Sequence, residues 1–253
     1  MIKLSLIISI LNSQEIVRRQ LLHFEKMNLP DDIEIILIDD GSDPPLDFTS
    51  NLKNLVTHVT NDKRSWTVEL ARNQGARMAR GEYLLMTDID YIIPLDAIMT
   101  GYTLKEDKAG FKREFGVIDE FGNFTQDFDV LRQYGLLESR IKERGTLLAP
   151  HPNNFIMSKE TFWKLGGYRE DLVDRPYPNK GDTYFKRSWA KALEKKEVMI
   201  QDANLRKTLY MFPNGKYCGD VDYNPFGLFH NLTRKTPSNY WYKNEKGVSD
   251  VAI

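Results

Sequence analysis

Cysteine is almost absent from this sequence of 253 residues, which contains only Cys218. A lone cysteine cannot form an intrachain disulfide, so nothing favours an oxidising compartment and a cytoplasmic location is expected. Long hydrophobic runs are also missing, because the apolar stretch within residues 1–11 is too short to cross a bilayer. We therefore expect no membrane span.

An excess of charge of one sign is likewise missing, since 35 Lys and Arg residues nearly balance 36 Asp and Glu residues. This balance excludes a broad basic footprint, so nucleic acid is not the expected partner, although a local groove stays open. The remaining composition, with 41% hydrophobic and 28% charged residues, is ordinary for a globular protein.

Short apolar runs alternate with helical patterns over the first hundred residues, which is typical of βαβ units. Strands are predicted over residues 4–11, 33–38, 56–59 and 83–87. Asn12 and Glu15 are spaced as a capping box that would open a helix ending at Met27, and a second helix is predicted over residues 66–80. The predicted fold is α/β, with a mainly parallel central sheet flanked by helices.

The second half of the chain has a different character. A hairpin that turns near Gly122 is predicted within residues 109–124, and helices are predicted over residues 128–142, 158–167 and 181–193.

Acidic residues follow two of the predicted strands. Asp39 and Asp40 end the second strand, and Asp88 and Asp90 end the fourth. Ligands of open α/β sheets bind beyond the carboxyl ends of the strands, so these four carboxylates predict a binding site at that edge.

Three segments carry a resemblance to a known family. Residues 71–90 combine a small-residue helix with a strand and the Asp88-Ile89-Asp90 motif, and residues 34–43 and 154–168 supply an acidic loop and a Gly-Gly-Tyr segment. In this order they resemble the family 2 glycosyltransferases, over roughly residues 3 to 190. The resemblance implies a Rossmann-like GT-A fold in which residues 1–100 form the nucleotide-sugar-binding lobe and residues 101–253 the acceptor-binding lobe.

The resemblance also implies a metal-dependent reaction. A divalent cation can neutralise the charge of a leaving diphosphate, and Mn²⁺ or Mg²⁺ would take oxygen ligands from Asp88 and Asp90. His230 is a candidate third ligand because some GT-A enzymes use a late histidine. The alternatives are a polar strand end for the two aspartates and a packing role for the histidine.

Residues expected to bind substrate come from both halves of the chain. The resemblance implies a nucleotide-sugar donor, with a UDP-sugar favoured, even though Leu11 replaces the aromatic residue usual after the first strand. Asp39 would meet the nucleobase unless it only shapes a turn, and Arg72 would approach the phosphates unless it is merely ion-paired. The full set implied to bind substrate is Ile10, Leu11, Asp39, Arg72, Asp88 and Asn154.

An inverting transferase needs a general base, and the family places an acidic residue after the Gly-Gly-aromatic segment. Asp182 fits that place, although the family usually has two adjacent acids there and this chain has Gly181 before the aspartate. Asp182 could equally cap the following helix. Glu170 and Asp171 are the reserve candidates.

Two other classes of protein compete with a glycosyltransferase. A nucleotidyltransferase could share the sheet and the paired acids, but residues 12–15 lack the Gly-rich phosphate loop of that class. A noncatalytic nucleotide-sugar-binding module would bind a donor without turnover. The expected acceptor is a saccharide or another hydroxyl compound, glycosylated one sugar at a time.

Overall fold

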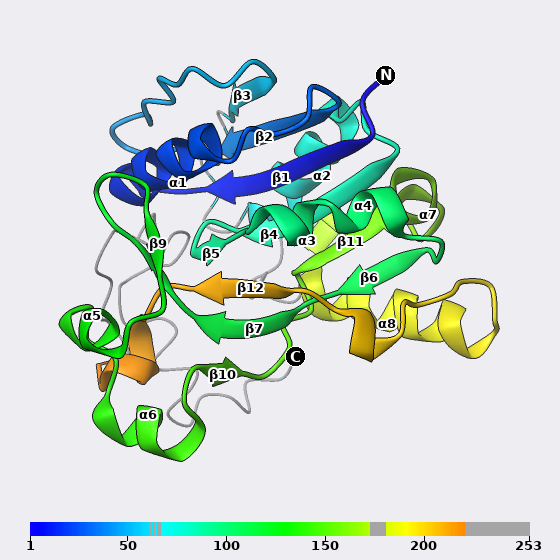
Figure 1. The fold of residues 1–253 in the computed structure, drawn as a ribbon. Helices are drawn as coiled ribbons and strands as arrows, with labels where there is room; N and C mark the ends of the chain where they lie inside the picture. The colour runs from blue at the N-terminus through cyan, green and yellow to red at the C-terminus, as the bar shows by residue number, and fades with distance from the viewer. Residues whose placement is uncertain (61, 63, 65–66, 173–180, 221–253) are drawn as a thin grey trace.

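A computed structural model gives the fold of the chain and describes residues 1–253 except 61, 63, 65–66, 173–180 and 221–253. The main sheet of this described part has the strand order β3 (Leu55–Val59), β2 (Ile33–Asp39), β1 (Leu4–Ile10), β4 (Tyr83–Asp88), β11 (Phe155–Ser158) and β6 (Lys108–Gly110). The first four are parallel, and β11 is antiparallel to both of its neighbours. The mainly parallel α/β sheet predicted from the sequence is therefore confirmed (Figure 1).

A smaller sheet has the order β10 (Leu147–Leu148), β7 (Lys112–Phe115), β12 (Thr208–Met211) and β5 (Tyr91–Ile92). The hairpin expected within residues 109–124 is formed only by β8 (Val117–Ile118) and β9 (Phe124–Thr125), with Gly122 in its turn at φ 84°. The start of that segment instead supplies β6 to the main sheet and β7 to the smaller sheet. The hairpin prediction was thus too long at its N-terminal end.

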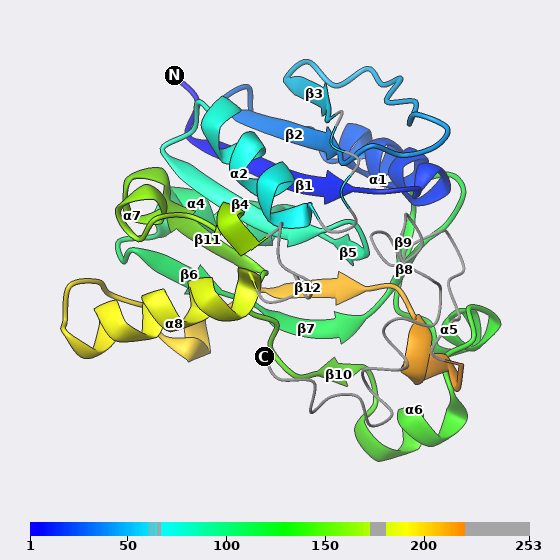
Figure 2. The same ribbon diagram turned by 180° about the vertical axis from the view of Figure 1, so that it is seen from behind.

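Helices cover both faces of the main sheet because the buried strands are apolar on both sides. Leu6 and Ile8 belong to the core cluster that includes Val17 of α1 (Gln14–Lys26), whereas Ile7 belongs to the cluster that includes Ala71 of α2 (Val68–Met78). Figure 2 shows α2 and α8 together on one side of the sheet. The longer helices are α1 (Gln14–Lys26), α2 (Val68–Met78) and α8 (Gly181–Glu194).

The shorter helices are α3 (Leu95–Ile98), α4 (Thr100–Thr103), α5 (Phe128–Gln133), α6 (Glu138–Arg144) and α7 (Lys159–Lys164). Two of them replace the single helix expected over residues 128–142, because Gly135 has φ 87° and interrupts the helical backbone. None of the helices in the described ranges has the length and apolar composition needed to cross a bilayer.

The capping box predicted at Asn12 and Glu15 is not formed. Asn12 has φ 50°, and its Oδ1 accepts a hydrogen bond from the backbone N–H of Asp43 at 2.9 Å instead of capping α1. Glu15 pairs with Arg18 and Arg19 along the helix. Asn12 therefore connects the loops after β1 and β2 at the carboxyl edge of the sheet.

Small residues let α2 pack closely on the sheet. Ala71, Gly75 and Ala79 recur at every fourth position and are buried, and a Cβ added to Gly75 would lie 2.5 Å from Cγ2 of Ile7. This close approach fixes the position of α2, and with it Arg72, relative to β1.

Gly81, between α2 and β4, is similarly crowded, but by backbone atoms as well as a side chain. Its N–H donates to Ser5 Oγ at 2.9 Å, and an added Cβ would lie 2.6 Å from the backbone N of Ser5. Because backbone cannot move aside as a side chain can, we expect Gly81→Ala to lower the free energy of unfolding by about 1–3 kcal/mol. Urea denaturation would measure this loss. Gly110→Ala is the control, because its Cβ would meet only Arg206 at 3.7 Å, and equal destabilisation of both variants would contradict the explanation.

Candidate active site

The strand register brings the predicted acids to one edge of the sheet. Ile10 pairs with Asp39, and Ser9 pairs with Asp88, so the carboxyl ends of β2 and β4 lie at the same level on either side of β1. Parallel pairing places the carboxyl ends of neighbouring strands at one edge of the sheet, so Asp39 and Asp88 lie at the same edge, as expected.

Asp39 organises the loop that follows β2. Its side chain is buried and accepts backbone hydrogen bonds from Gly41 (3.1 Å) and Ser42 (2.7 Å) at Oδ1 and from Leu46 (3.1 Å) at Oδ2. These hydrogen bonds match the alternative in which Asp39 shapes a turn. The carboxylate is engaged by its own loop in this structure, and contact with a nucleobase stays a prediction.

Asp40 is also buried, and both of its carboxylate oxygens accept from Thr67 Oγ1 at 2.8 Å. It lines a pocket of about 430 Å³ together with His58, Thr60, Gln74 and Arg77. The ends of β2 and β3 thus border an open space beside α2.

Ile10 and Leu11, both expected to bind substrate, are only 1% exposed. The Ile10 carbonyl accepts from the N–H of Asp40 at 2.7 Å, and the Leu11 carbonyl accepts from Ser13 Oγ at 2.7 Å. Their side chains fill the core beneath the edge.

Arg72 and Asp88 form the central ion pair of the site. Arg72 Nη2 donates to Asp88 Oδ1, and the guanidinium lies 5.4 Å from the ring centroid of Tyr168. Burial opposes the charge on Arg72, but Asp88 outweighs it and raises the pKa of the guanidinium above its ordinary value. Arg72 therefore stays charged while its side chain is only 4% exposed. The ion pair with Asp88 matches the alternative in which Arg72 is ion-paired. The Nε of Arg72 is buried and has no hydrogen-bond partner among the described residues.

Asp90 lies next to this pair. Its Oδ2 accepts from Asn214 Nδ2 at 3.3 Å, while its Oδ1 is buried without a hydrogen-bond partner. Burial, and then the charge of Asp88, raise the pKa of Asp90 to about 7. A positive ion beside Asp90 would relieve both effects.

The two aspartates fit a divalent cation of the kind expected from the sequence. Mn²⁺ and Mg²⁺ accept one or two carboxylates together with substrate phosphates and water, so two protein ligands are sufficient. Within the described ranges, no group of three or more His, Cys, Asp or Glu side chains could hold a metal ion. His230, the candidate third ligand, lies outside the described residues.

Asn154 and His151 lie in the segment before β11, near the end of β4. Thr87 Oγ1 donates to Asn154 Oδ1 at 3.2 Å, and Asn154 Nδ2 is buried without a partner. His151 Nδ1 lies 3.9 Å from Asp88 Oδ2. Burial lowers the pKa of His151 more than Asp88 raises it, which favours the neutral imidazole. Arg72, paired with Asp88, and Asn154, bonded to the adjacent Thr87, therefore each leave a buried donor without a partner among the described residues.

An amide clamp joins α2 to the Gly-Gly-Tyr segment. Asn73 Nδ2 donates to the Tyr168 carbonyl at 2.8 Å, and Asn73 Oδ1 accepts from the Tyr168 N–H at 3.0 Å. Gly167, at φ 60°, lets the backbone approach, since a Cβ there would lie 3.0 Å from Asn73 Oδ1. Neither Asn73 nor Asn214 could be predicted from the sequence, because no sequence pattern connects residues 95 or 124 positions apart.

Removing this clamp should destabilise the protein. Asn73→Ala leaves the backbone groups of Tyr168 buried and unpaired, so we expect a loss of roughly 1–3 kcal/mol in the free energy of unfolding. The measurement is chemical denaturation followed by circular dichroism. Gln74→Ala, one residue further along α2, removes a partly exposed amide and should change the stability much less. Similar losses in both variants would mean that the clamp is not the cause.

The three candidate bases differ in their partners. Glu170 accepts from Asn73 and pairs with Arg77, and Asp171 pairs with Arg169. Asp182, in the first turn of α8, accepts from the N–H of Thr183 at 2.6 Å.

Asp182 lies close enough to the central pair for its charge to act on Arg72, His151 and Tyr168. Because α8 begins at Gly181, Asp182 lies inside the helix, and its carboxylate accepts from the adjacent Thr183. An N-cap residue precedes the first helical residue, and Asp182 follows it. Asp182 therefore does not occupy the N-cap position of α8.

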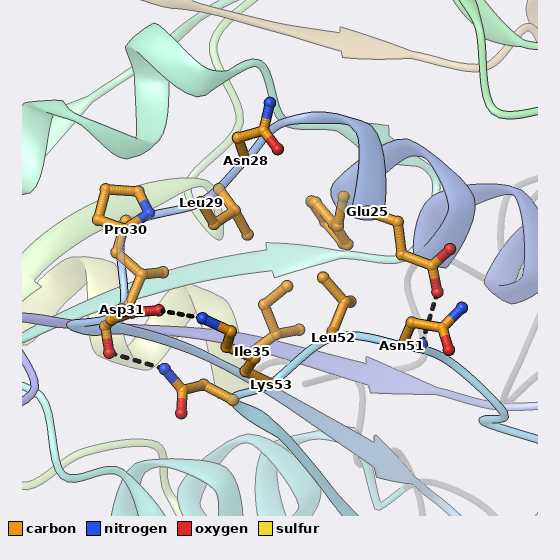
Figure 3. Close-up of a pocket in the computed structure, with 12 residues that line it drawn as sticks. Glu25, Asn28, Leu29, Pro30, Asp31, Ile35, Asn51, Leu52 and Lys53 are labelled. Carbon is orange, nitrogen blue, oxygen red and sulfur yellow. Dashed lines mark hydrogen bonds and ion pairs between the residues drawn. The ribbon is translucent and has the colours of Figure 1, made fainter.

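A second pocket, of about 350 Å³, lies away from this site, at the end where β2 begins. Its apolar lining includes Phe24, Leu29, Ile35 and Leu52 (Figure 3). It contains none of the residues described above and has no part in the candidate site.

Comparison with known proteins identifies the class. Residues 5–166, more than half of the chain, match the model of glycosyl transferase family 2. The chain belongs to this family, so the family expected from the sequence is confirmed.

The relatives are similar over unequal lengths. A poly(ribitol-phosphate) beta-glucosyltransferase from Bacillus spizizenii is 30% identical over 110 residues, which cover 42% of this chain and 17% of that protein. The crystal structure of S. aureus TarS matches with a TM-score of 0.52 and 14% identity, over 84% of this chain and 37% of the other. TarS 1-349 in complex with UDP matches with a TM-score of 0.51 and 16% identity, over 85% of this chain and 62% of the other.

The structural matches confirm the GT-A fold. This chain spans less than two thirds of the length of each of these relatives. The division into a donor lobe over residues 1–100 and an acceptor lobe over residues 101–253 stays a prediction, and β6 and β11 of the second part complete the main sheet of the first.

Proposed function

We propose that this protein transfers a sugar from a nucleoside-diphosphate sugar to an acceptor hydroxyl, with inversion at the anomeric carbon. The observation that carries the proposal is the buried Arg72–Asp88 pair at the carboxyl edge of the sheet, bordered by buried polar atoms without partners. A chain of this family with such an edge has both the charge and the unused hydrogen-bonding capacity that a diphosphate requires.

Arg72 is the proposed contact to the leaving diphosphate. Its Nε–H has no partner in the described part of the chain, and a guanidinium presents a planar set of donors suited to phosphate oxygens. Asp88 would hold the guanidinium in place through the ion pair, and the ring of Tyr168 would pack against it. Because the pKa of Arg72 is raised, it would remain a cation throughout the reaction.

Asp88 and Asp90 would hold Mn²⁺ or Mg²⁺, which when bound would neutralise charge on the diphosphate. The support is the buried, unpartnered Oδ1 of Asp90. A role of His230 as a further ligand stays part of this proposal.

The nucleoside would lie toward the 430 Å³ pocket beside Asp40. Uracil is favoured as its base, since the related TarS was crystallised with UDP. The loop held by Asp39 would form one wall, and Gln74 offers an amide that lines the pocket. Asn154, with its unpaired amide N–H, would bind the donor sugar.

Asp182 is the proposed general base. It would take the proton of the acceptor hydroxyl as the new bond to the anomeric carbon forms and the bond to the diphosphate oxygen breaks, with the electron pair leaving on the diphosphate. The support is its charge acting on Arg72 and His151 and its lack of an ion pair among the described residues. The acceptor is expected to be a saccharide or another polyol, and the Bacillus spizizenii relative is named for a poly(ribitol-phosphate).

The test is to incubate the protein with a panel of nucleoside-diphosphate sugars, Mn²⁺ and hydroxyl acceptors, and to measure release of the nucleoside diphosphate. We expect release that depends on the acceptor, stops with a chelator and resumes when Mn²⁺ is restored. Donor binding by calorimetry without release for any acceptor would instead identify a noncatalytic binding module. Release of pyrophosphate in a separate incubation with a nucleoside triphosphate and a sugar 1-phosphate would identify a nucleotidyltransferase.

A further inference from the structure

Lys108 of β6 has an environment unusual for a lysine. Its Nζ lies 4.6 Å from the ring centroid of Phe155, 4.9 Å from that of Trp189 and 5.8 Å from that of Phe185. The ammonium therefore faces three aromatic rings, of which two belong to α8. Aromatic faces attract a cation but do not replace the hydrogen bonds that water would provide.

Two further cations lie near this ammonium. Arg206 covers Gly110 of β6, where its guanidinium carbon is 3.7 Å from the position of an added Cβ, and its Nε is buried without a hydrogen-bond partner. Lys186 lies on α8 between the two residues whose rings face Lys108, and it is exposed. Burial, then the charges of Arg206 and Lys186, lower the pKa of Lys108 to about 8.

These three cations have no counter-charge in the described part of the chain. No carboxylate there forms an ion pair with Lys108, Lys186 or Arg206. By contrast, the buried Arg72 is paired with Asp88, and the partly buried Arg19 is paired with Glu15. Clustered cations that repel one another and leave a buried N–H unused are stabilised by an oxyanion with several acceptor oxygens.

We propose that Lys108, Lys186 and Arg206 form an anion-binding site that takes a phosphate group of the acceptor. A phosphate carries more charge than a carboxylate and offers three or more oxygens, which suits three separate cations. Assigning the phosphate to the acceptor rests on the proposed function. Lys186 follows Asp182 by four residues, so it lies one helical turn, roughly 6 Å, from the proposed base.

This position would hold a phosphate next to the reacting hydroxyl. The donor diphosphate would occupy the other side of Asp182, at Arg72. The site would therefore select acceptors that carry a phosphate close to the hydroxyl that is glycosylated.

The site can be tested without any turnover. The full chain is labelled on its lysines and titrated with inorganic phosphate, while NMR follows the Lys108 side chain, whose signal is identified by its loss in Lys108→Met. Phosphate should raise the pKa of Lys108, because an anion favours the charged ammonium. Lys186→Gln and Arg206→Gln should each weaken phosphate binding by roughly tenfold, the loss expected for one charge-assisted hydrogen bond. Lys191→Gln, on an exposed position of the same helix, is the matched control.

Unchanged phosphate affinity in both variants would overturn the site, whether or not the protein proves to be a transferase. The acceptor assignment has its own test, a comparison of KM for a phosphate-bearing acceptor and its neutral counterpart. Lys186→Gln and Arg206→Gln should raise KM for the phosphate-bearing acceptor alone. An equal rise for both acceptors would show that the bound phosphate is not part of the acceptor.

Discussion

The Asp90→Asn variant is expected to lose about a thousandfold in metal-stimulated turnover, while its fold is no less stable than that of the parent protein. The loss follows because an amide is a much weaker cation ligand than a carboxylate, and a bound cation contributes several kcal/mol to charge stabilisation. The side chain keeps its size and can still bond with Asn214, so the surrounding structure should persist.

The stability effect has the opposite sign because Asp90 is unfavourably placed as an anion. Burial and the neighbouring Asp88 raise its pKa to about 7, well above the value of an unfolded aspartate. The folded state then binds more protons than the unfolded state between about pH 4 and pH 7, so stability falls as pH rises through this range. Asp90→Asn should flatten that fall, and thermal unfolding in the presence of a chelator, from pH 4 to pH 8, would measure it.

Asp96→Asn is the matched control for Asp90→Asn. Asp96 is an exposed aspartate of α3 that makes only a surface pair with Lys207 at 3.6 Å, and such pairs contribute little. Its replacement should leave turnover and the pH dependence unchanged. Full activity with an unaltered Mn²⁺ requirement in Asp90→Asn would remove Asp90 from the metal site.

The carboxyl edge of the sheet could be predicted because it depends on local patterns. The unbroken apolar runs of β1 and β2 can be buried only in a sheet covered on both faces, and parallel pairing then brings Asp39 and Asp88 to one end. The small residues of α2 likewise predicted the close packing that holds Arg72 above that end.

The contacts that could not be predicted join residues far apart in the sequence. The amide of Asn73 holds the backbone of Tyr168, and Asn214 reaches Asp90, across 95 and 124 residues. The smaller sheet contains strands of two residues, β5 and β10, which are too short to have a periodicity. The capping-box prediction was wrong for a similar reason, because the Asn12 side chain instead accepts from the N–H of Asp43, 31 residues away.

Asp182→Asn should lower kcat by roughly 10²- to 10⁴-fold while donor and metal affinity stay nearly unchanged. An amide cannot accept the proton of the acceptor hydroxyl, and the lost interaction belongs to the transition state rather than to substrate binding. The substitution keeps an oxygen able to accept from the Thr183 N–H, so α8 should remain intact. Steady-state kinetics with saturating acceptor, together with calorimetric titration of the donor, would separate the two effects.

Asp171→Asn provides the comparison, because Asp171 lies in the segment before α8 and already pairs with Arg169. If Asp182 is the base, Asp171→Asn should retain near-normal kcat while Asp182→Asn does not. If Asp182 only completes the first turn of α8, asparagine should substitute well, since the two residues accept backbone hydrogen bonds with similar strength there. Near-normal turnover of Asp182→Asn would reject Asp182 as the base. The base would then be Asp171 or Glu170, depending on which replacement abolishes kcat. Glu170→Gln would also disturb the contacts to Asn73 and Arg77, so its unfolding free energy must be measured beside its kinetics.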